Sequence, residues 1–387
     1  MTLDELKRSF KNSYGVEATG VYFCPGRVNL IGEHIDYNGG LVMPGAVTFG
    51  TWLLVAPNKT NLFYFKSLNF EEEKSISLTN EIEKDESFWF NYPSGVIKHL
   101  KDKGVEINCG LNMLFFGDMP IGSGLSSSAS IEVVTAFALN QLFNGQLDML
   151  ELVKLTKAVE NQFIGVNSGI MDQFAVVFGE QDKALMLDCE TLKYEAVDVC
   201  LNNYTLTIIN SNKTRTLADS KYNERVKECQ TALCSLQKKL NITQLCQINA
   251  DTLYQNKHLI TDKIIFKRAR HVIEENDRVK QAADVLKRGD LKQFGTLMNL
   301  SHQSLKELYE VSGAELDTIA EYSRYYKGVL GSRMTGAGFG GCAIALVKTD
   351  FFDDYSRDLC EYYTTKFGYS PAVYKSDIGA GVRKYSD

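Results

Sequence analysis

The sequence predicts a globular protein of about two domains that combines strands with helices. Its 387 residues and a hydrophobic content of 44% are enough for two substantial cores. Short apolar runs of strand length stand beside longer segments in which apolar residues recur at helical spacing. We place the domain junction near residue 190, before the long helical patterns of the second half, so the expected domains are 1–190 and 191–387.

Composition argues against several functional classes. Lys and Arg number 42 against 48 Asp and Glu, which gives a net charge of -6, and no basic run follows a nucleic-acid backbone. No segment approaches the ~18 apolar residues of a membrane span, and the N-terminus lacks a signal core. The nine scattered cysteines fit reduced thiols. We expect a cytoplasmic protein with no nucleic-acid, membrane or obligate protein partner.

Residues 21–47 enclose a densely polar centre between two apolar stretches, after an amphipathic helical pattern at the N-terminus. Polar groups bunched in this way seldom serve packing, and carboxylates or an imidazole beside an arginine can fix the hydroxyls of a polyol. A solvated hairpin loop is the alternative, but the flanking runs have the composition of buried strands. We expect a small polar substrate at these residues: Arg27, Asn29, Glu33, His34, Asp36 and Asn38.

His34 differs from the other histidines because it lies in this polar centre. The others do not cluster with one another or with cysteines, as the ligands of a metal site would. We expect these four to be ordinary helix-face or surface residues: His99, His258, His271 and His302.

The following segments predict a sheet and then a helix. Residues 51–56 and 61–66 are strand-like runs rich in Val, Phe, Tyr and Leu, and a heavily acidic stretch follows at 71–87. Trp89 stands just before a proline and a helical pattern that runs to Leu100. An indole at such a break can stack on a purine base, although core packing is the commoner fate of tryptophan. Both interpretations stay open at this point.

A Gly/Ser loop at 117–130, GDMPIGSGLSSSAS, joins a buried strand at 111–116 to a helical pattern, with Ser127 or Ser128 suited to cap the first turn. Unpaired N–H groups at a helix start favour a phosphate, and the glycines of the loop allow a close backbone approach. The loop has no Walker A lysine, and no HRD or DFG element follows it. We expect a phosphate site, with a serine-rich surface turn as the alternative.

An aspartate interrupts the apolar helical segment at 170–178. A carboxylate in such surroundings must be paired, solvated in a cleft or chemically employed, because burying its charge alone is costly. We favour a chemical role for Asp172. Upstream, Glu160 is a candidate ligand for the hard cation that phosphoryl transfer requires, with a solvent-facing side chain as the alternative.

The second half begins with strand-like segments over 184–210 and continues with helical patterns at 219–240, 267–287 and 314–327. A later glycine string holds a Gly-x-Gly-x-x-Gly at Gly336, Gly338 and Gly341. A dinucleotide fingerprint must open a helix, whereas this string leads into a strand at 342–347, so a Rossmann interpretation fails. We expect a loop that closes over the active site from the second domain, with a plain β-turn as the alternative.

Over nearly its whole length the sequence resembles the GHMP family of small-molecule kinases. The resemblance rests on PGRVNLIGEHIDYN at 25–38, GSGLSSSAS at 122–130 and GSRMTGAGFGGC at 331–342. The first of these motifs, GIMDQF at 169–174 and YEVSGAELD at 309–317 are typical of the family members that phosphorylate galactose. The chain departs from their commonest pattern at Glu307-Leu308, where many have two aspartates, in a segment not thought to touch substrate.

The resemblance implies an α+β protein with the active site between two domains. The first domain would be similar to the ribosomal-protein-S5-like fold and the second to a ferredoxin-like α/β sandwich. The implied activity is ATP-dependent phosphorylation of D-galactose at its anomeric hydroxyl, which gives galactose 1-phosphate and ADP. Galactose and Mg-ATP would then be the partners, with Mg²⁺ as the cofactor.

The resemblance also assigns roles to residues. Arg27 and Asp172 would be the catalytic pair, and Ser128 and Glu160 would hold Mg²⁺. The implied sugar contacts are Glu33, His34, Asp36, Gly169 and Tyr222. The implied ATP contacts are Gly122, Ser123, Gly124, Leu125, Ser126, Ser127 and Ser128, with Trp89 near the adenine.

Two kinds of relative are alternatives to this function. Some phosphorylate N-acetylgalactosamine or another sugar, and some are sensors that bind ATP and galactose without catalysis. Sensors can be shortened within the Ser-rich loop. Here GLSSSAS is uninterrupted and both Arg27 and Asp172 are present, which favours an enzyme.

Overall fold

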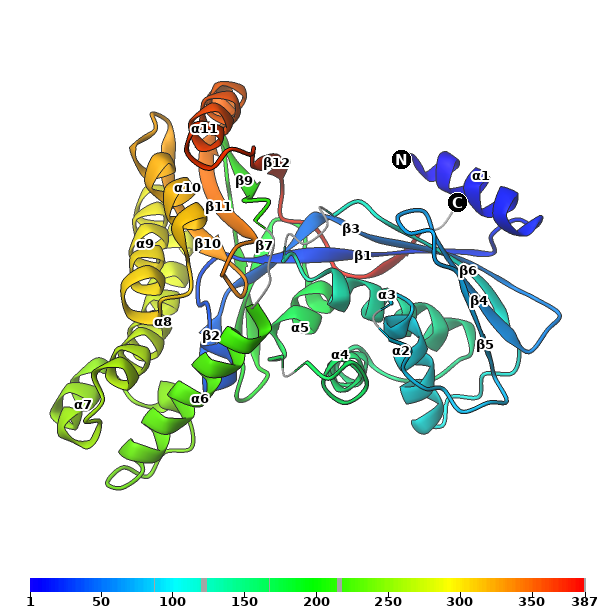
Figure 1. Cartoon of the computed structure of the whole chain (residues 1–387), viewed down its shortest axis with the longest axis horizontal. Helices are drawn as coiled ribbons and strands as arrows, with labels where there is room; N and C mark the ends of the chain where they lie inside the picture. The colour runs from blue at the N-terminus through cyan, green and yellow to red at the C-terminus, as the bar shows by residue number, and fades with distance from the viewer. Residues whose placement is uncertain (87, 120–123, 167, 214–217, 386–387) are drawn as a thin grey trace.

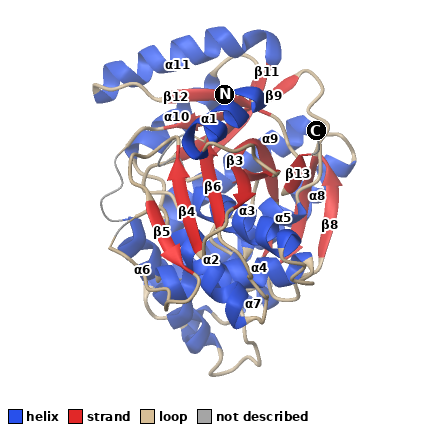
Figure 2. Ribbon diagram, turned by 90° about the vertical axis from the view of Figure 1, so that its right-hand side faces the viewer, coloured by secondary structure: helices blue, strands red, loops and turns tan. Residues whose placement is uncertain are grey.

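Two main β-sheets form the framework of the computed structural model, which describes residues 1–86, 88–119, 124–166, 168–213 and 218–385 (Figure 1). The larger sheet has the strand order β13-β1-β3-β6-β4-β5, and Figure 2 shows β5, β4, β6 and β3 side by side. Its strands are β1 (Gly20–Asn29), β3 (Pro44–Pro57), β4 (Leu62–Ser67), β5 (Lys74–Ser77), β6 (Leu111–Gly117) and β13 (Arg383–Tyr385). The strands predicted at 51–56, 61–66 and 111–116 are confirmed.

Alternating side chains give this sheet two covered faces. Leu54 of β3 packs with Leu6 and Phe10 on one face, whereas its neighbours Leu53 and Val55 belong to the main core on the other. Helix α1 covers the first face, and α2 and α3 pack together against the second (Figure 1). These helices are α1 (Leu3–Tyr14), α2 (Asn91–Asp102) and α3 (Ser127–Leu142).

The elements between α3 and residue 198 pack against β1 and against the polar residues that follow it. Helix α5 packs on α3, on β1 and on β3. Strand β2, which follows the polar region, pairs with β7 in a three-stranded sheet of order β2-β7-β8. The elements are β2 (Leu41–Val42), α4 (Met149–Ala158), the π-helical turn η2 (Val159–Ile164), α5 (Met171–Phe178), β7 (Lys183–Asp188) and β8 (Tyr194–Asp198).

The second main sheet has the order β10-β11-β9-β12, and α8, α9 and α10 lie on its side away from the first sheet (Figure 1). Its strands are β9 (Tyr204–Asn210), β10 (Val329–Thr335), β11 (Cys342–Lys348) and β12 (Ala372–Ser376). The helices of this half are α6 (Ala218–Leu236), α7 (Ala250–Gln255), α8 (Lys263–Lys287), α9 (Leu291–Ser304), α10 (Ala314–Tyr325) and α11 (Phe352–Phe367). The predicted helices at 219–240, 267–287 and 314–327 are confirmed, with shifted ends.

Helix α9 was not expected from the sequence, and Gly295 in its middle gives a physical reason. A Cβ on Gly295 would lie 2.4 Å from the carbonyl oxygen of Leu330, and one on Gly331 would lie 2.1 Å from the carbonyl oxygen of Gly295. Two glycines therefore let α9 lie directly on β10. Glycine is thus required at position 295 for this packing, although glycine weakens the helical pattern of the sequence.

One cluster of buried apolar residues runs through both halves, from Val28 of β1 to Ile344 of β11. The chain also crosses back at its end, because β13 pairs with β1 through Tyr385 opposite Val21. The division at residue 190 stays a prediction. Among the helices that the structure describes, none combines the length and apolar character needed to cross a membrane.

Candidate active site

Arg27 of β1 and Asp172 of α5 form a bidentate ion pair. Arg27 Nε donates to Asp172 Oδ1 and Nη2 donates to Oδ2, both at 2.8 Å. Its third nitrogen, Nη1, donates to the carbonyl oxygen of Gly124 at 2.7 Å, and the whole residue is 5% exposed. One guanidinium thus fixes the carboxylate of α5 and the end of the Gly/Ser loop in one geometry.

A bulge in β1 explains how the strand and the loop come so close. The register of β1 against β3 shifts between Pro25 and Arg27, and Arg27 N donates to Leu125 O at 3.0 Å. A Cβ on Gly26 would lie 2.6 Å from that same carbonyl oxygen. The Pro-Gly-Arg sequence therefore provides both the bulge and the space that brings the Gly/Ser loop onto β1.

The start of α3 differs from the expectation that Ser127 or Ser128 caps it. The N-cap is Ser126, which has a left-handed backbone with φ of 62° and makes no side-chain capping bond. Its hydroxyl instead donates a short hydrogen bond to Asp172 Oδ2. The first-turn N–H groups of α3 are left without a side-chain cap, as an anion site at a helix start requires. Gly122 and Ser123 lie outside the described residues.

Glu160 is buried beside this helix start and is not solvent-facing. The residue is 6% exposed, and its π-helical turn η2 carries it toward α3. Ser128 Oγ donates to its Oε1 at 2.9 Å. Oε2 accepts from Ser168 Oγ at 2.5 Å and from Gln173 Nε2 at 2.8 Å. The structure thus brings together the two residues that the resemblance assigned to Mg²⁺.

Glu33 lies deeper than a simple sugar contact would. It is 1% exposed and accepts a short hydrogen bond from Asn29 Nδ2, another from the backbone N–H of Gly336, and a third from Arg333 Nη2 at 3.3 Å. Burial raises the pKa of Glu33, against the lowering effect of the nearby arginines. The carboxylate therefore joins the polar region of β1 to the β10–β11 loop.

Asp36 and Gly169 lie directly against each other. Asp36 is half-buried in the turn η1 (Asp36–Asn38), and a Cβ on Gly169 would lie 1.7 Å from its Oδ2. Burial, together with the nearby charges of Asp172 and Glu33, raises the pKa of Asp36 to about 7. The position after Ser168 therefore has to be glycine for this carboxylate to keep its place.

His34 starts a chain of hydrogen-bonded hydroxyl groups. Burial lowers its pKa to about 3, so the imidazole is neutral. Its Nε2 contacts the carbonyl oxygen of Ala337 at 3.2 Å, and a carbonyl only accepts, so Nδ1 accepts from Tyr37 at 2.9 Å. Tyr37 then accepts in turn from the hydroxyl of Tyr309 at 2.8 Å. The ring of Tyr222 lies 5.6 Å from that of His34.

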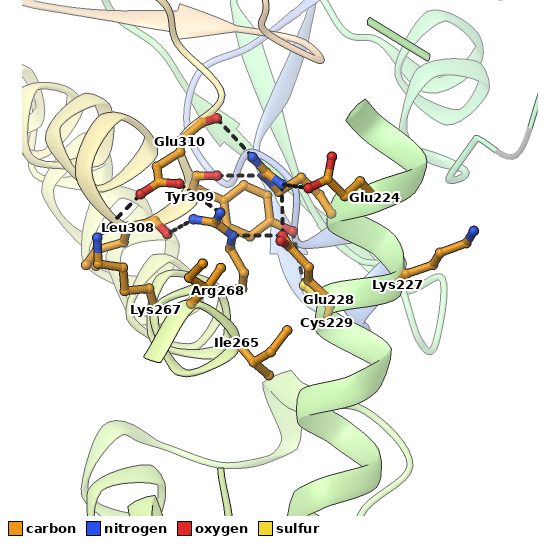
Figure 3. A network of polar contacts seen from close by, with 12 residues as sticks. Glu224, Lys227, Glu228, Cys229, Ile265, Lys267, Arg268, Leu308, Tyr309 and Glu310 are labelled. Atoms are coloured by element: carbon orange, nitrogen blue, oxygen red, sulfur yellow. Dashed lines mark hydrogen bonds and ion pairs between the residues drawn. The ribbon is translucent and has the colours of Figure 1, made fainter. Parts of the chain in front are cut away.

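An ion network joins α6, the helix that also carries Tyr222, to its neighbours, and Figure 3 shows Glu228, Arg268 and Glu310 within it. One turn after Tyr222, Arg225 donates to the carbonyl oxygen of Tyr309 at 2.8 Å and pairs with Glu228 at 2.9 Å. Glu228 also accepts from Arg268 of α8 at 2.8 Å. Arg268 continues to Glu310 at 2.9 Å. Helix α6 is thus tied to α8 and to the turn that carries Tyr309.

The glycine string with Gly336, Gly338 and Gly341 begins beside the polar residues of β1, and its closing over the active site stays a prediction. Besides the bond from Gly336 N to Glu33, Thr335 Oγ1 accepts from Asn29 N at 3.0 Å. The loop leads into β11, as the sequence predicted.

The structure also places two buried histidines and Trp89, for which the sequence had given expectations. His271 of α8 and His302 of α9 lie on helices, as the helix-face interpretation expected, but on buried faces. His271 Nδ1 contacts Ser304 at 2.8 Å, and its Nε2 contacts the carbonyl oxygen of Glu33 at 3.2 Å. Trp89 is half-buried, with Nε1 donating to Glu72 O at 3.1 Å and its ring against Phe115. A position near the adenine stays a prediction for Trp89.

Sequence reasoning missed several residues of this site. Tyr37 lies inside a motif that was recognised, and its polar side chain there was a signal that it belongs to the site. Ser126 was expected to contact ATP, but its bond to Asp172 was not expected. Gln173 follows Asp172 in GIMDQF, and as a polar side chain inside a recognised motif it could have been found in the same way as Tyr37. Arg333 lies inside the recognised motif at 331–342, but its bonds to Asn29 and Glu33 reach the other half of the chain, so the motif did not reveal its role.

Comparison with known proteins gives consistent matches. Family models match at 91–180 (GHMP kinases N terminal domain), at 282–354 (GHMP kinases C terminal) and at 8–57 (galactokinase galactose-binding signature). A Staphylococcus carnosus protein named galactokinase is 48% identical over 98% of this chain and 99% of its own. One from Streptococcus thermophilus is 47% identical over 99% of each chain.

Solved structures agree with these matches. The crystal structure of Lactococcus lactis galactokinase complexed with galactose is similar with a TM-score of 0.95 and 45% identity, covering 100% of both chains. The Methanococcus jannaschii mevalonate kinase has a TM-score of 0.65 at 23% identity and covers 92% of this chain and 98% of its own, a likeness of fold alone.

Proposed function

The chain belongs to the galactokinase family of GHMP kinases, and from this premise we propose which residues perform the reaction. Membership makes it an ATP-dependent kinase that phosphorylates galactose, with the α+β fold of GHMP kinases. The proposed acceptor is the anomeric hydroxyl. One observation carries these proposed roles: Arg27 holds the carboxylate of Asp172 beside the Gly/Ser loop.

In the proposed mechanism Asp172 is the general base. Its carboxylate accepts a hydrogen bond from the anomeric hydroxyl and takes the proton as the oxygen bonds to the γ-phosphorus and ADP leaves. Arg27 orients the carboxylate through two hydrogen bonds and adds positive charge beside the transferring group. Ser126 donates to Oδ2 of this carboxylate. The oxygen that would accept from the sugar is therefore Oδ1, which also accepts from Arg27 Nε.

The uncapped start of α3 is the proposed phosphate seat. Backbone N–H groups over 124–128 and the positive end of the α3 dipole would offset the charge of the β and γ phosphates. Trp89, and Gly122 and Ser123 outside the described residues, complete the proposed ATP contacts.

The residues around Glu160 fit a Mg²⁺ ion that arrives with the nucleotide. Mg²⁺ commonly binds one or two carboxylates together with substrate phosphates and waters, and this site offers one buried carboxylate and one hydroxyl. Among the described residues, no group of three or more His, Cys, Asp or Glu side chains gathers to hold a metal ion. Glu160 and Ser128 would hold the ion, which supplies positive charge against the phosphates.

Galactose is proposed to bind between Asp36 and the α6 side of the site. Asp36 would accept a hydrogen bond from a sugar hydroxyl, with Tyr222 and His34 as further contacts. Glu33 would act mainly by fixing the backbone of the loop, since protein donors already contact both of its oxygens.

The proposal is tested by ADP release with galactose, N-acetylgalactosamine, glucose, mevalonate and homoserine as acceptors. We expect turnover with galactose far above the others. Saturable galactose binding without any ADP release would identify a sensor, and preferred turnover of another sugar would replace galactose as the substrate.

Gly169→Ala is expected to lower kcat/KM for galactose by ~10²-fold, because the added Cβ forces Asp36 from its position and small misplacements at a site carry such costs. The KM for ATP should stay near the wild-type value. Steady-state kinetics on both substrates give the answer. Gly104→Ala, after α2 and outside the site, is the control: nothing lies within 4 Å of a Cβ there, and its φ of +83° makes it a control for backbone strain as well. An unchanged KM and kcat for galactose would contradict the placement of Asp36.

Gly124→Val is expected to weaken ATP binding by about tenfold or more while galactose binding persists. Gly124 has φ of +75°, and a β-branched residue there is strained by ~1–3 kcal/mol, which moves the backbone of the phosphate seat. Calorimetric titration with ATP measures the effect. The control is Gly104→Val, at φ of +83° with open space around it. If ATP affinity falls equally in the control, or in neither variant, the loop is a turn and not a phosphate site.

A further inference from the structure

Glu132 is a buried carboxyl group that the mechanism above does not use. It lies one turn after Ser128 in α3 and is 0% exposed. Neither of its carboxylate oxygens has a hydrogen-bond partner among the residues that the structure describes. An ionised carboxylate in that position would be very costly, because it has lost water and gained no donor.

Gln173 lies beside Glu132 and is equally buried, at 0% exposed. Its Nε2 donates to Glu160 Oε2 at 2.8 Å, which fixes the orientation of the amide. Its other end, Oε1, finds no donor within the described part of the chain. Both oxygens of Glu132 and Oε1 of Gln173 therefore lack partners, and a single proton on one Glu132 oxygen would join the two side chains in a hydrogen bond.

The surroundings of Glu132 favour that proton. Burial raises the pKa of Glu132 well above its usual range, the charge of Glu160 raises it further, and the contact with Gln173 lowers it. A neutral carboxyl group both removes the cost of a buried charge and provides an O–H donor.

We propose that Glu132 and Gln173 are positioning residues for Glu160. The neutral carboxyl of Glu132 donates to Gln173 Oε1, and this holds the Gln173 amide with its N–H toward Glu160 Oε2. Glu160 then keeps Oε1 at Ser128, which is the side that faces the phosphate seat. The inference rests on the proposed metal role of Glu160 and extends it to a chain of three side chains from α3, α5 and η2.

Glu132 and Gln173 matter because the carboxylate of Glu160 could rotate without them. Its carboxylate has one fixed contact on Oε1, and on Oε2 it depends on Ser168 and Gln173. An amide that flips would present an oxygen to the carboxylate and repel it. Partners behind a metal ligand typically change metal affinity by ~10- to 100-fold when they are lost.

The test compares four variants by calorimetric binding of a non-hydrolysable ATP analogue over a range of Mg²⁺ concentrations, with galactose binding as the measure of an intact fold. Glu132→Leu and Gln173→Leu should each raise the Mg²⁺ concentration for half-maximal binding by ~10-fold or more, with galactose affinity unchanged. Glu132→Gln should stay within about threefold of wild type, because its amide N–H replaces the proposed O–H donor. Glu160→Gln reports on the metal ligand itself.

Three results would overturn the inference. The first is a Glu132→Gln variant that loses Mg²⁺ response as strongly as Glu132→Leu, since charge and not donation would then matter. The second is a wild-type Mg²⁺ response in Gln173→Leu, which decides the matter even if Glu132→Leu does not fold. The third is a wild-type response in Glu160→Gln, which would also remove the proposed metal role. A loss in Glu160→Gln with wild-type behaviour in the other variants would leave that role intact.

Discussion

Asp172→Asn is expected to lower kcat by ~10²- to 10⁴-fold, the usual cost of removing a general base, while galactose and ATP still bind. Asparagine has the same shape but cannot take up the proton of the sugar hydroxyl. Because Arg27 donates two hydrogen bonds to this carboxylate, the amide nitrogen will also face one donor and lose that bond. Single-turnover kinetics, together with calorimetric affinities for both substrates, separate the chemical step from binding.

Asp198→Asn is the matched control, because this aspartate is exposed at the end of β8, outside the site. It should behave as wild type. An Asp172→Asn variant that keeps more than about a tenth of the wild-type kcat would show that the carboxylate is not the base. A variant with normal chemistry but weak galactose binding would instead make Asp172 a sugar contact.

Asp36→Ala is expected to lower kcat/KM for galactose severely and to reduce the preference for galactose over glucose. The two sugars differ only in the axial 4-hydroxyl, so selectivity needs polar groups placed at that position. A site that hydrogen-bonds a substrate hydroxyl can reject the analogue that leaves its groups unpaired by ~10⁴-fold. The half-buried Asp36 offers a carboxyl group that can make such a hydrogen bond. The measurement is kcat/KM for both sugars on the wild type and the variant.

Tyr222→Phe tests the second contact in the same assay and should narrow the galactose/glucose ratio with a milder loss of rate. Tyr254→Phe, an exposed tyrosine of α7, is the control for the loss of a hydroxyl. If the wild type uses glucose within about tenfold of galactose, or if Asp36→Ala leaves the ratio unchanged, the proposed basis of sugar selectivity is wrong.

The elements that carry the motifs could be predicted from sequence because each depends on short-range pattern. The strand at 111–116, the helix after the Gly/Ser loop and the strand after Gly341 follow from apolar periodicity and from glycine at turns. The same local patterns carried the family resemblance, and with it the fold class and the galactose kinase activity.

Other features of the fold needed the tertiary structure. Helix α9 contains Gly295, whose cost to a helix is offset by contact with Leu330 on β10. Strand β13 joins the first sheet at the far end of the chain. The acid stretch at 71–87 contains β5, whose pairing with β4 overrides a charged composition.

The site shows the same division. The sequence determined which chemical groups this protein has, Arg27 and Asp172 above all, because motifs are read from neighbouring residues. Only the tertiary structure decided their partners: Arg27 meets Asp172 across 145 positions, and Arg333 meets Asn29 across 304. It also buried His271 and sent the Ser126 hydroxyl to Asp172 instead of to a helix cap. Side-chain partners at such separations depend on how whole elements pack, and residue spacing does not encode that packing.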